Sequence, residues 1–149
     1  MELSTLNNLY EKLETKSYDV FFEIESGFCT AFEELGEKPD YIKAFIALVN
    51  WNNLSSSDGA GAFYEEYLDQ WADQSYPAAV GCVLERLGKQ ELNRFFQMGL
   101  REGDIPITPE EREQKDRMID DYIDEHFDEI WETEAMILTE YKNEILAEP

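Results

Sequence analysis

The sequence predicts an all-α protein: a single-domain bundle of seven to eight helices with a long acidic C-terminal helical arm. Apolar residues recur at three- and four-residue steps along most of the chain, and no alternating run of useful length indicates a strand. The 149 residues are one domain's length, and 43 % hydrophobic residues are too many for a disordered acidic chain. We therefore expect residues 1–149 to form one folded body with a sizeable core.

Six helices are expected before the arm. Ser17 is a suitable N-cap for the second of them, and Gly36 and Gly88 are natural stops for the second and fifth. The fourth is expected to continue to about Gln74, and Pro77 is expected to open the fifth. The apolar periodicity places the six over residues 6–13, 17–35, 39–51, 63–74, 77–87 and 92–100.

The strongest predicted break lies between the third and fourth helices. Asparagine, serine, aspartate and glycine dominate from Asn52 to Gly61, and these residues have low helix propensity. We expect a polar loop there, of unassigned role. A second linker is expected over residues 101–107.

The acidic arm runs from Thr108 to Leu146. Thr108 suits an N-cap, Pro109 the first helical position and Glu111 the reciprocal contact of a capping box. A break near Glu132 and Thr133 is possible, because the residues that follow fit a separate helix equally well. The stripe expected to be buried is Ile119, Tyr122, Ile123, Phe127, Ile130 and Trp131.

The opposite face of the arm carries carboxylates at high density. The seven from Asp120 to Glu132 span 12 helical steps. Their mean axial spacing is therefore about 3 Å, close to the roughly 3.4 Å per phosphate of one DNA strand. Such a rod could imitate a nucleic-acid backbone, but a solvated face on a very acidic protein has the same pattern. The predicted partner-binding residues are Asp116, Asp120, Asp121, Asp124, Glu125, Asp128, Glu129 and Glu132.

Further acidic residues extend this prediction. Glu110, Glu111 and Glu113 continue the face toward the start of the arm. A second acidic row, which could equally be a solvated face, is Glu65, Glu66, Asp69 and Asp73.

The net charge of −22 limits the possible partners. From residue 102 onward there are 17 acids and 4 bases, net −13, and the first 101 residues hold 17 acids and 8 bases, net −9. Such a field repels nucleic acid and anionic membranes and attracts basic proteins. We expect no direct binding to nucleic acid or to a membrane, and the absence of an N-terminal signal pattern predicts a cytoplasmic location.

No motif indicates an enzyme, a cofactor or a metal site. His126 is the only histidine, and the residues before it form no Glu-x-x-His pair, which argues against zinc and di-iron sites; a half-buried or surface position is expected for it. Every acidic pair looks solvated, so no raised carboxyl pKa is expected. Cys29 and Cys82 are expected to be reduced, buried thiols.

One segment resembles a known family. The run from Gly61 through Phe63 to Tyr67, the helix ending in Leu87-Gly88, and the final Glu140-Tyr141 helix are similar to the DNA-mimic protein nineteen family, a bacterial all-α group. The resemblance covers about residues 40–146, although members usually have a second glycine where this chain has Ala62. It implies a homodimer whose negative surface imitates duplex DNA and keeps a helix-turn-helix transcription factor off its operator.

The function expected from these features is that of a DNA mimic, which binds the DNA-contacting surface of a basic DNA-binding protein. Its carboxylates would pair with the arginines and lysines that normally contact phosphates. Two alternatives stay open. The chain could be an acidic immunity protein or antitoxin that blocks a basic nuclease or toxin, or a small enzyme or metal-binding protein that uses the carboxylates directly.

Overall fold

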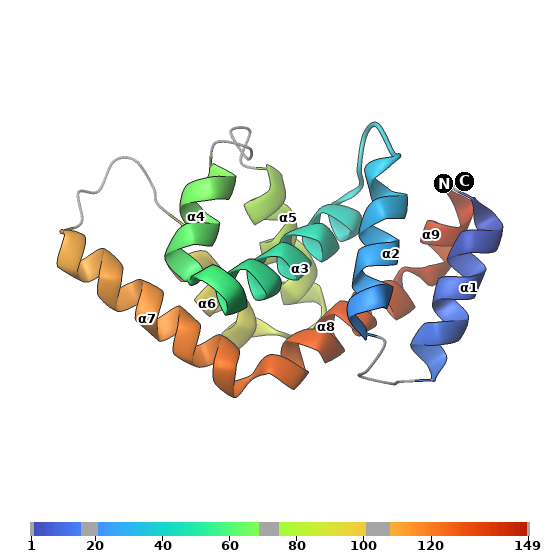
Figure 1. The fold of residues 1–149 in the computed structure, drawn as a ribbon. Helices are drawn as coiled ribbons and strands as arrows, with labels where there is room; N and C mark the ends of the chain where they lie inside the picture. Colours follow the sequence, from blue (N-terminus) through green and yellow to red (C-terminus); the bar gives the residue numbers. More distant parts are fainter. Residues whose placement is uncertain (1, 16–20, 69–74, 101–107, 149) are drawn as a thin grey trace.

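The computed structural model describes residues 2–15, 21–68, 75–100 and 108–148, and these residues form nine helices and no strand (Figure 1). The all-α prediction is confirmed. The count exceeds the expected seven to eight because the arm is divided into three helices. The helices are α1 (Leu3–Glu14), α2 (Phe21–Glu33), α3 (Asp40–Asp58), α4 (Ala60–Leu68), α5 (Ser75–Arg86), α6 (Gln90–Met98), α7 (Pro109–Glu125), α8 (Phe127–Glu140) and α9 (Lys142–Ala147).

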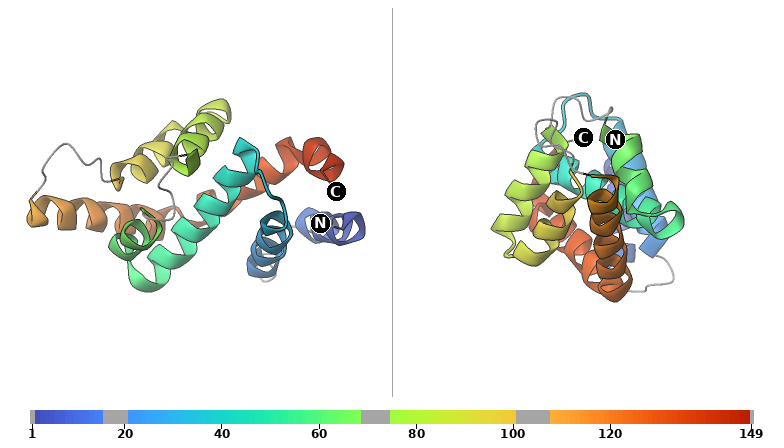
Figure 2. Two further views of the ribbon diagram at one scale, coloured as in Figure 1. Left: turned by 90° about the horizontal axis from the view of Figure 1, so that it is seen from above. Right: turned by 90° about the vertical axis from the view of Figure 1, so that its left-hand side faces the viewer.

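Helix α3 is the centre of the bundle. It packs against α2, α4, α5, α7 and α8. Helices α4, α5 and α6 gather around one end of α3, and α1, α2 and α9 lie at the other (Figures 1 and 2). Helices α7 and α8 run along one side of the molecule and connect the two ends. The acidic arm is therefore packed along the body of the bundle.

Aromatic side chains join α3 to α4 and α6. Trp51, Tyr64 and Phe96 are fully buried. The ring centroid of Phe96 lies 5.5 Å from that of Trp51 and 6.4 Å from that of Tyr64. The Trp51 indole nitrogen donates a hydrogen bond to the Tyr64 hydroxyl at 3.0 Å, and that hydroxyl donates to the backbone carbonyl of Phe96 at 2.6 Å. Both polar groups are thus satisfied inside the core.

A second group of contacts holds the other end together. Phe28 and Phe32 of α2 pack edge-on against Phe45 of α3. The hydroxyl of Tyr10 on α1 donates a 2.8 Å hydrogen bond to the carbonyl of Leu138 on α8. The first helix is thereby attached to the C-terminal part of the chain.

The predicted loop from Asn52 to Gly61 is wrong for most of its length, because α3 continues to Asp58. Asn52 and Ser55 are buried, so this last part of α3 is packed against the body of the protein. Tertiary packing overrides low helix propensity, which amounts to less than about 1 kcal/mol per residue. The break occurs at Gly59 alone, whose φ of 93° favours glycine.

The expected start of the arm is confirmed. Thr108 is the N-cap of α7, its hydroxyl accepts a hydrogen bond from the Glu111 amide at 3.1 Å, and Pro109 is the first helical residue. Helix α5 begins at Ser75, two residues before the expected Pro77. The expected cap at Ser17, the expected helix end at Gln74 and the expected linker 101–107 lie outside the described residues.

Candidate functional site

The arm is bent at His126 and does not form one straight rod. The His126 amide donates to the Tyr122 carbonyl at 2.9 Å, but its φ of −122° and ψ of 26° are not helical, so α7 ends and α8 begins there. The break that the sequence allowed near Glu132 and Thr133 does not occur, because α8 continues to Glu140. Figure 1 shows α7 and α8 meeting at an angle. The phosphate-like spacing therefore applies within each helix separately.

Aromatic stacking fixes this bend. The Tyr122 ring stacks with two others. Its centroid lies 4.1 Å from that of His126 and 4.1 Å from that of Phe95 on α6. A ring nitrogen of His126 lies 3.0 Å from the Tyr122 carbonyl. His126 is half-buried, as expected. It stabilises the junction between α7 and α8.

Buried apolar side chains hold both helices of the arm in place. Ile119, Tyr122, Ile123 and Ile130 are buried, which confirms most of the predicted stripe. Phe127 and Trp131 are only partly buried. The polar faces of α7 and α8 are consequently fixed with respect to the core.

Asp120, one of the eight predicted partner-binding residues, has an intramolecular role. Its carboxylate accepts a 2.8 Å hydrogen bond from the amide of Ala60, the first residue of α4. It thus caps a helix N-terminus from another helix, where free amides and the helix dipole favour a negative charge. Partial burial raises the pKa of Asp120, the Ala60 amide opposes this effect, and Asp124 and Asp121 add to it.

Asp116 lies one turn before Asp120 and is also directed at the start of α4. A Cβ atom added to Gly61 would come within 2.8 Å of its Oδ2 atom. Glycine at this position therefore allows the α4 backbone to approach α7 closely. Asp116 and Asp120 serve the contact between α4 and α7, and both are only partly exposed.

Glu129 also has a partner within the chain. Its carboxylate lies 3.7 Å from the Lys89 ammonium in the turn between α5 and α6, and its side chain is 39 % exposed. An ion pair as exposed as this contributes little to stability. It nevertheless neutralises part of the charge that Glu129 would offer to a partner.

The remaining five predicted residues are exposed, and we call them the acidic row. They are Asp121, Asp124, Glu125, Asp128 and Glu132. The first three occupy one helical turn at the end of α7, about 6 Å long at roughly 1.5 Å per residue. The other two lie on α8, beyond the bend.

The weaker extensions of the site are exposed as well. Glu110, Glu111 and Glu113 lie at the start of α7, where Glu113 forms a 2.7 Å ion pair with Arg117. Glu65 and Glu66 of the second row are exposed on α4. Asp69 and Asp73 lie outside the described residues.

Two glutamates form an acidic pair that is buried. Glu25 of α2 is 1 % exposed and Glu134 of α8 is fully buried. No oxygen of either carboxyl group has a hydrogen-bond partner of good geometry among the described residues, although Asn53 and the opposite carboxyl lie close to Glu25. The expectation that every acidic pair is solvated is therefore wrong.

Burial and proximity change how this pair ionises. Desolvation raises the pKa of Glu134 well above its usual range, and the neighbouring Glu25 raises it further. Desolvation also raises the pKa of Glu25, while the nearby polar side chains of Glu134 and Asn53 partly oppose that rise. Because two adjacent buried carboxylates cannot both be charged cheaply, protons are retained at higher pH than on solvated glutamates.

One sequence signal could have identified this pair. Glu25 is four residues after Phe21 and three before Phe28, and Glu134 is four after Ile130 and three before Ile137. Both glutamates therefore occupy positions of a buried stripe. Charged residues at such positions are usually assigned to the surface, and the signal was missed for that reason.

Both thiols were expected to be buried, and Cys29 is only partly so. Cys29 lies next to the glutamate pair, and burial, together with the nearby carboxylates, raises the pKa of its thiol to about 12. Cys82 is exposed, so its predicted burial is wrong. Both cysteines are free thiols.

An apolar groove lies between α1, α2, α8 and α9. Its volume is about 650 Å³, within the range of ligand pockets in proteins. The Glu25–Glu134 pair does not line it. The residues that do are Tyr10, Leu13, Glu14, Phe21, Ile24, Leu87, Trp131, Glu132, Ala135, Met136, Thr139, Glu140 and Lys142.

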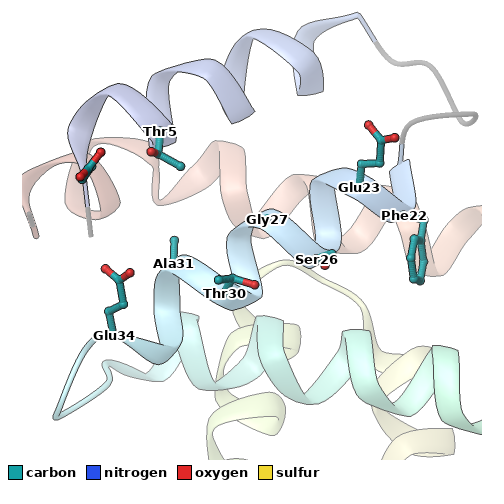
Figure 3. A pocket seen from close by; sticks show the side chains of 9 residues that line it. Thr5, Phe22, Glu23, Ser26, Gly27, Thr30, Ala31 and Glu34 are labelled. Carbon is teal, nitrogen blue, oxygen red and sulfur yellow. The ribbon is translucent and has the colours of Figure 1, made fainter.

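A smaller hollow lies along α1 and α2 (Figure 3). Phe22, which is 66 % exposed, lies at one end of it and Glu34 at the other. Its polar side chains Thr5, Ser26 and Thr30 are exposed. The hollow therefore has surface character and lacks buried binding groups.

The described residues contain no group of three or more histidine, cysteine, aspartate or glutamate side chains arranged to hold a metal ion. Among these same residues, none of the helices combines the length and the apolar character needed to cross a membrane. The chain matches no protein-family model, no curated protein and no solved structure with which it was compared. The similarity to the DNA-mimic family therefore rests on the sequence motifs alone.

Proposed function

We propose that this protein binds the DNA-contacting surface of a basic DNA-binding protein and prevents that protein from binding DNA. The observation that carries the proposal is the acidic row, a set of exposed carboxylates on two helices whose opposite faces are buried in the core. Fixed carboxylates can accept the bidentate hydrogen bonds that arginine gives to phosphate. A helix-turn-helix transcription factor, the partner in the similar family, is the proposed target.

Fewer carboxylates are available to a partner than the sequence pattern suggested. Asp120 and Glu129 have partners within the chain and Asp116 faces α4, so we assign partner contacts to the acidic row alone. A homodimer, which the family resemblance implies, would present two such rows at a fixed separation, as a dimeric repressor requires of two half-sites.

The test compares two variants with the same change in charge. The first replaces Asp121 and Asp124 by Asn and Glu125 by Gln, all within the acidic row. The second replaces three exposed glutamates elsewhere by Gln: Glu11, Glu33 and Glu37. Each protein is immobilised and used to capture proteins from native cell extract at low and high salt.

Capture of a DNA-binding protein, released by high salt, is expected for the wild type and for the second variant. The first variant should capture much less, and the captured protein should lose duplex DNA when wild-type protein is added. Equal capture by both variants would contradict the site. A captured nuclease or toxin that does not compete with operator DNA would favour the immunity-protein alternative.

A further inference from the structure

We infer that the apolar groove between α1, α2, α8 and α9 binds a basic amphipathic helix of a partner protein. This inference goes beyond the proposed function, because the acidic row recognises cationic groups in any setting, whereas the groove requires an apolar face. Glu132 is the one residue that belongs to both surfaces.

The groove has the apolar floor that such a helix needs. Phe21, Ile24, Leu87, Trp131 and Ala135 contribute to it. The Trp131 ring packs on Phe21 at 4.8 Å and on Phe127 at 4.4 Å, and the residue is only partly buried. Amphipathic helices bind in this way by placing side chains at i, i+3, i+4 and i+7 in a preformed groove.

Met136 gives the groove an adaptable wall. It is one of the few large hydrophobic side chains exposed among the described residues, at 38 %. Methionine is flexible and polarisable, and it is frequent on surfaces that accept helices of different sequence. Its exposure costs solvation energy that a bound apolar face would recover.

The charges on the rim select a cationic helix. Glu132 and Glu140 are exposed on α8, one turn on either side of Met136. Lys142 is the groove's one cation among the described residues, and it lies 3.7 Å from Glu14 and over the Tyr10 ring, so its charge is partly compensated. The remaining rim is negative, on a chain whose net charge is −22.

The same charges disfavour a second copy of this chain as the occupant. Two copies joined at this groove would bring two acidic rims together, and like charges in an interface are strongly unfavourable. A lysine-rich helix, in contrast, would place its apolar side on Trp131 and Met136 and its cations beside Glu132 and Glu140.

The test uses a fluorescein-labelled peptide of about 18 leucine and lysine residues, with leucine at helical i, i+3, i+4 and i+7 spacing. A peptide of the same composition in scrambled order controls for general attraction to an acidic protein. Fluorescence anisotropy at about 0.15 M salt, where long-range attraction is largely screened, gives both affinities. The patterned peptide should bind wild-type protein at least about tenfold more tightly.

Two matched variants locate the binding. Met136→Lys places a cation between Glu132 and Glu140 in the groove, and Met118→Lys makes the same change at an exposed methionine of α7, outside the groove. Thermal unfolding verifies that both variants fold. The first should weaken binding of the patterned peptide at least about tenfold, and the second no more than about twofold.

The other outcomes overturn the inference. Equal binding of the two peptides, no binding of either, or equal losses in both variants would exclude a helix-binding groove. A wild-type dimer in sedimentation that Met136→Lys converts to monomer would identify the groove as an interface between copies. The variant altered at Asp121, Asp124 and Glu125 keeps the groove intact, so it should bind the peptide whether or not the acidic row captures a DNA-binding protein.

Discussion

The carboxylate of Asp120 on α7 accepts a 2.8 Å hydrogen bond from the backbone amide of Ala60 at the start of α4. Asp120 belongs to the acidic face by sequence, yet it caps the start of a helix that lies 60 residues earlier in the chain. The surface charge pattern and the packing of α4 are coupled at this point. A change at Asp120 therefore cannot serve as a pure test of partner binding.

Replacing Asp120 by Ala should destabilise the protein. The variant leaves the Ala60 amide without its acceptor, and loss of a helix cap costs about 1 kcal/mol. For a protein of this size that corresponds to a decrease in Tm of roughly 2–4 °C, measurable by circular dichroism. Asp120→Asn keeps an acceptor oxygen and should change Tm little.

The neighbouring Asp121 provides the control. It is exposed, so Asp121→Ala should stay within about 0.5 kcal/mol of wild type. If Asp120→Ala and Asp121→Ala had the same Tm, the cap would have no energetic importance.

The two glycines beside this cap should respond differently to alanine. Gly59 has a φ of 93°, a conformation that is strained for alanine, so Gly59→Ala should cost about 1 kcal/mol. In Gly61→Ala, the new Cβ meets only the carboxylate end of Asp116, and the better helix propensity of alanine offsets the shift that this side chain must make. Urea unfolding should therefore show a lower midpoint for the first variant and a nearly unchanged one for the second. The opposite order would mean that contact between α4 and α7 matters more than backbone strain.

The sequence was sufficient for the features that depend on local pattern. The apolar periodicity located the buried face of the arm, and the Thr108-Pro109 signal located its start, because both arise within a few residues. The all-α class follows from the same periodicity. The assignment of the acidic row to a partner remains a prediction.

Features that depend on distant contacts could not be predicted. Asn52 and Ser55 are helical because α3 is packed on several sides, although their own propensities favour a loop. Asp120 looks identical in sequence to Asp121, and only the position of α4 distinguishes them. Glu25 and Glu134 each occupy a buried stripe of their own helix, but only the packing of α2 near α8 makes them a pair.

The two thiols should differ strongly in reactivity toward a thiol reagent at pH 8. Cys82 is exposed and should react rapidly. Cys29, with a pKa raised to about 12 by burial, is almost entirely protonated and should react only after unfolding. Mass spectrometry of alkylated protein gives the number of modified sites with and without denaturant. In Cys82→Ser, fast modification of the native protein would show that Cys29 is accessible.

The buried glutamates should make the protein less stable as pH rises. A carboxyl group whose folded-state pKa is raised binds more protons in the folded than in the unfolded state between the two pKa values. Its favourable contribution is complete below the unfolded pKa, about 4.5, and is lost as pH increases through the folded-state pKa of Glu134. Unfolding free energy should therefore decrease from pH 4.5 upward.

Repulsion among the surface acids of a chain with net charge −22 changes stability in the same direction, so a variant must isolate the buried pair. Glu134→Gln replaces the ionisable group by a neutral one of similar shape. It should be more stable than wild type at pH 7–8, by an amount on the order of 1–3 kcal/mol, because wild-type folding must either protonate or desolvate the Glu134 carboxylate and glutamine requires neither. The two proteins should converge near pH 4, where the wild-type carboxyl is also neutral.

Glu132→Gln is the matched control, because it removes one charge from the same helix at an exposed position. Its stability difference from wild type should be small and nearly independent of pH, since the charge it removes is solvated in both states. A pH-dependent gain in Glu134→Gln but not in Glu132→Gln would attribute the effect to desolvation of the Glu25–Glu134 pair. If the unfolding free energies of the two variants changed with pH in parallel, the pH dependence would come from the overall charge. The two buried carboxyl groups would then have to ionise like glutamates in water.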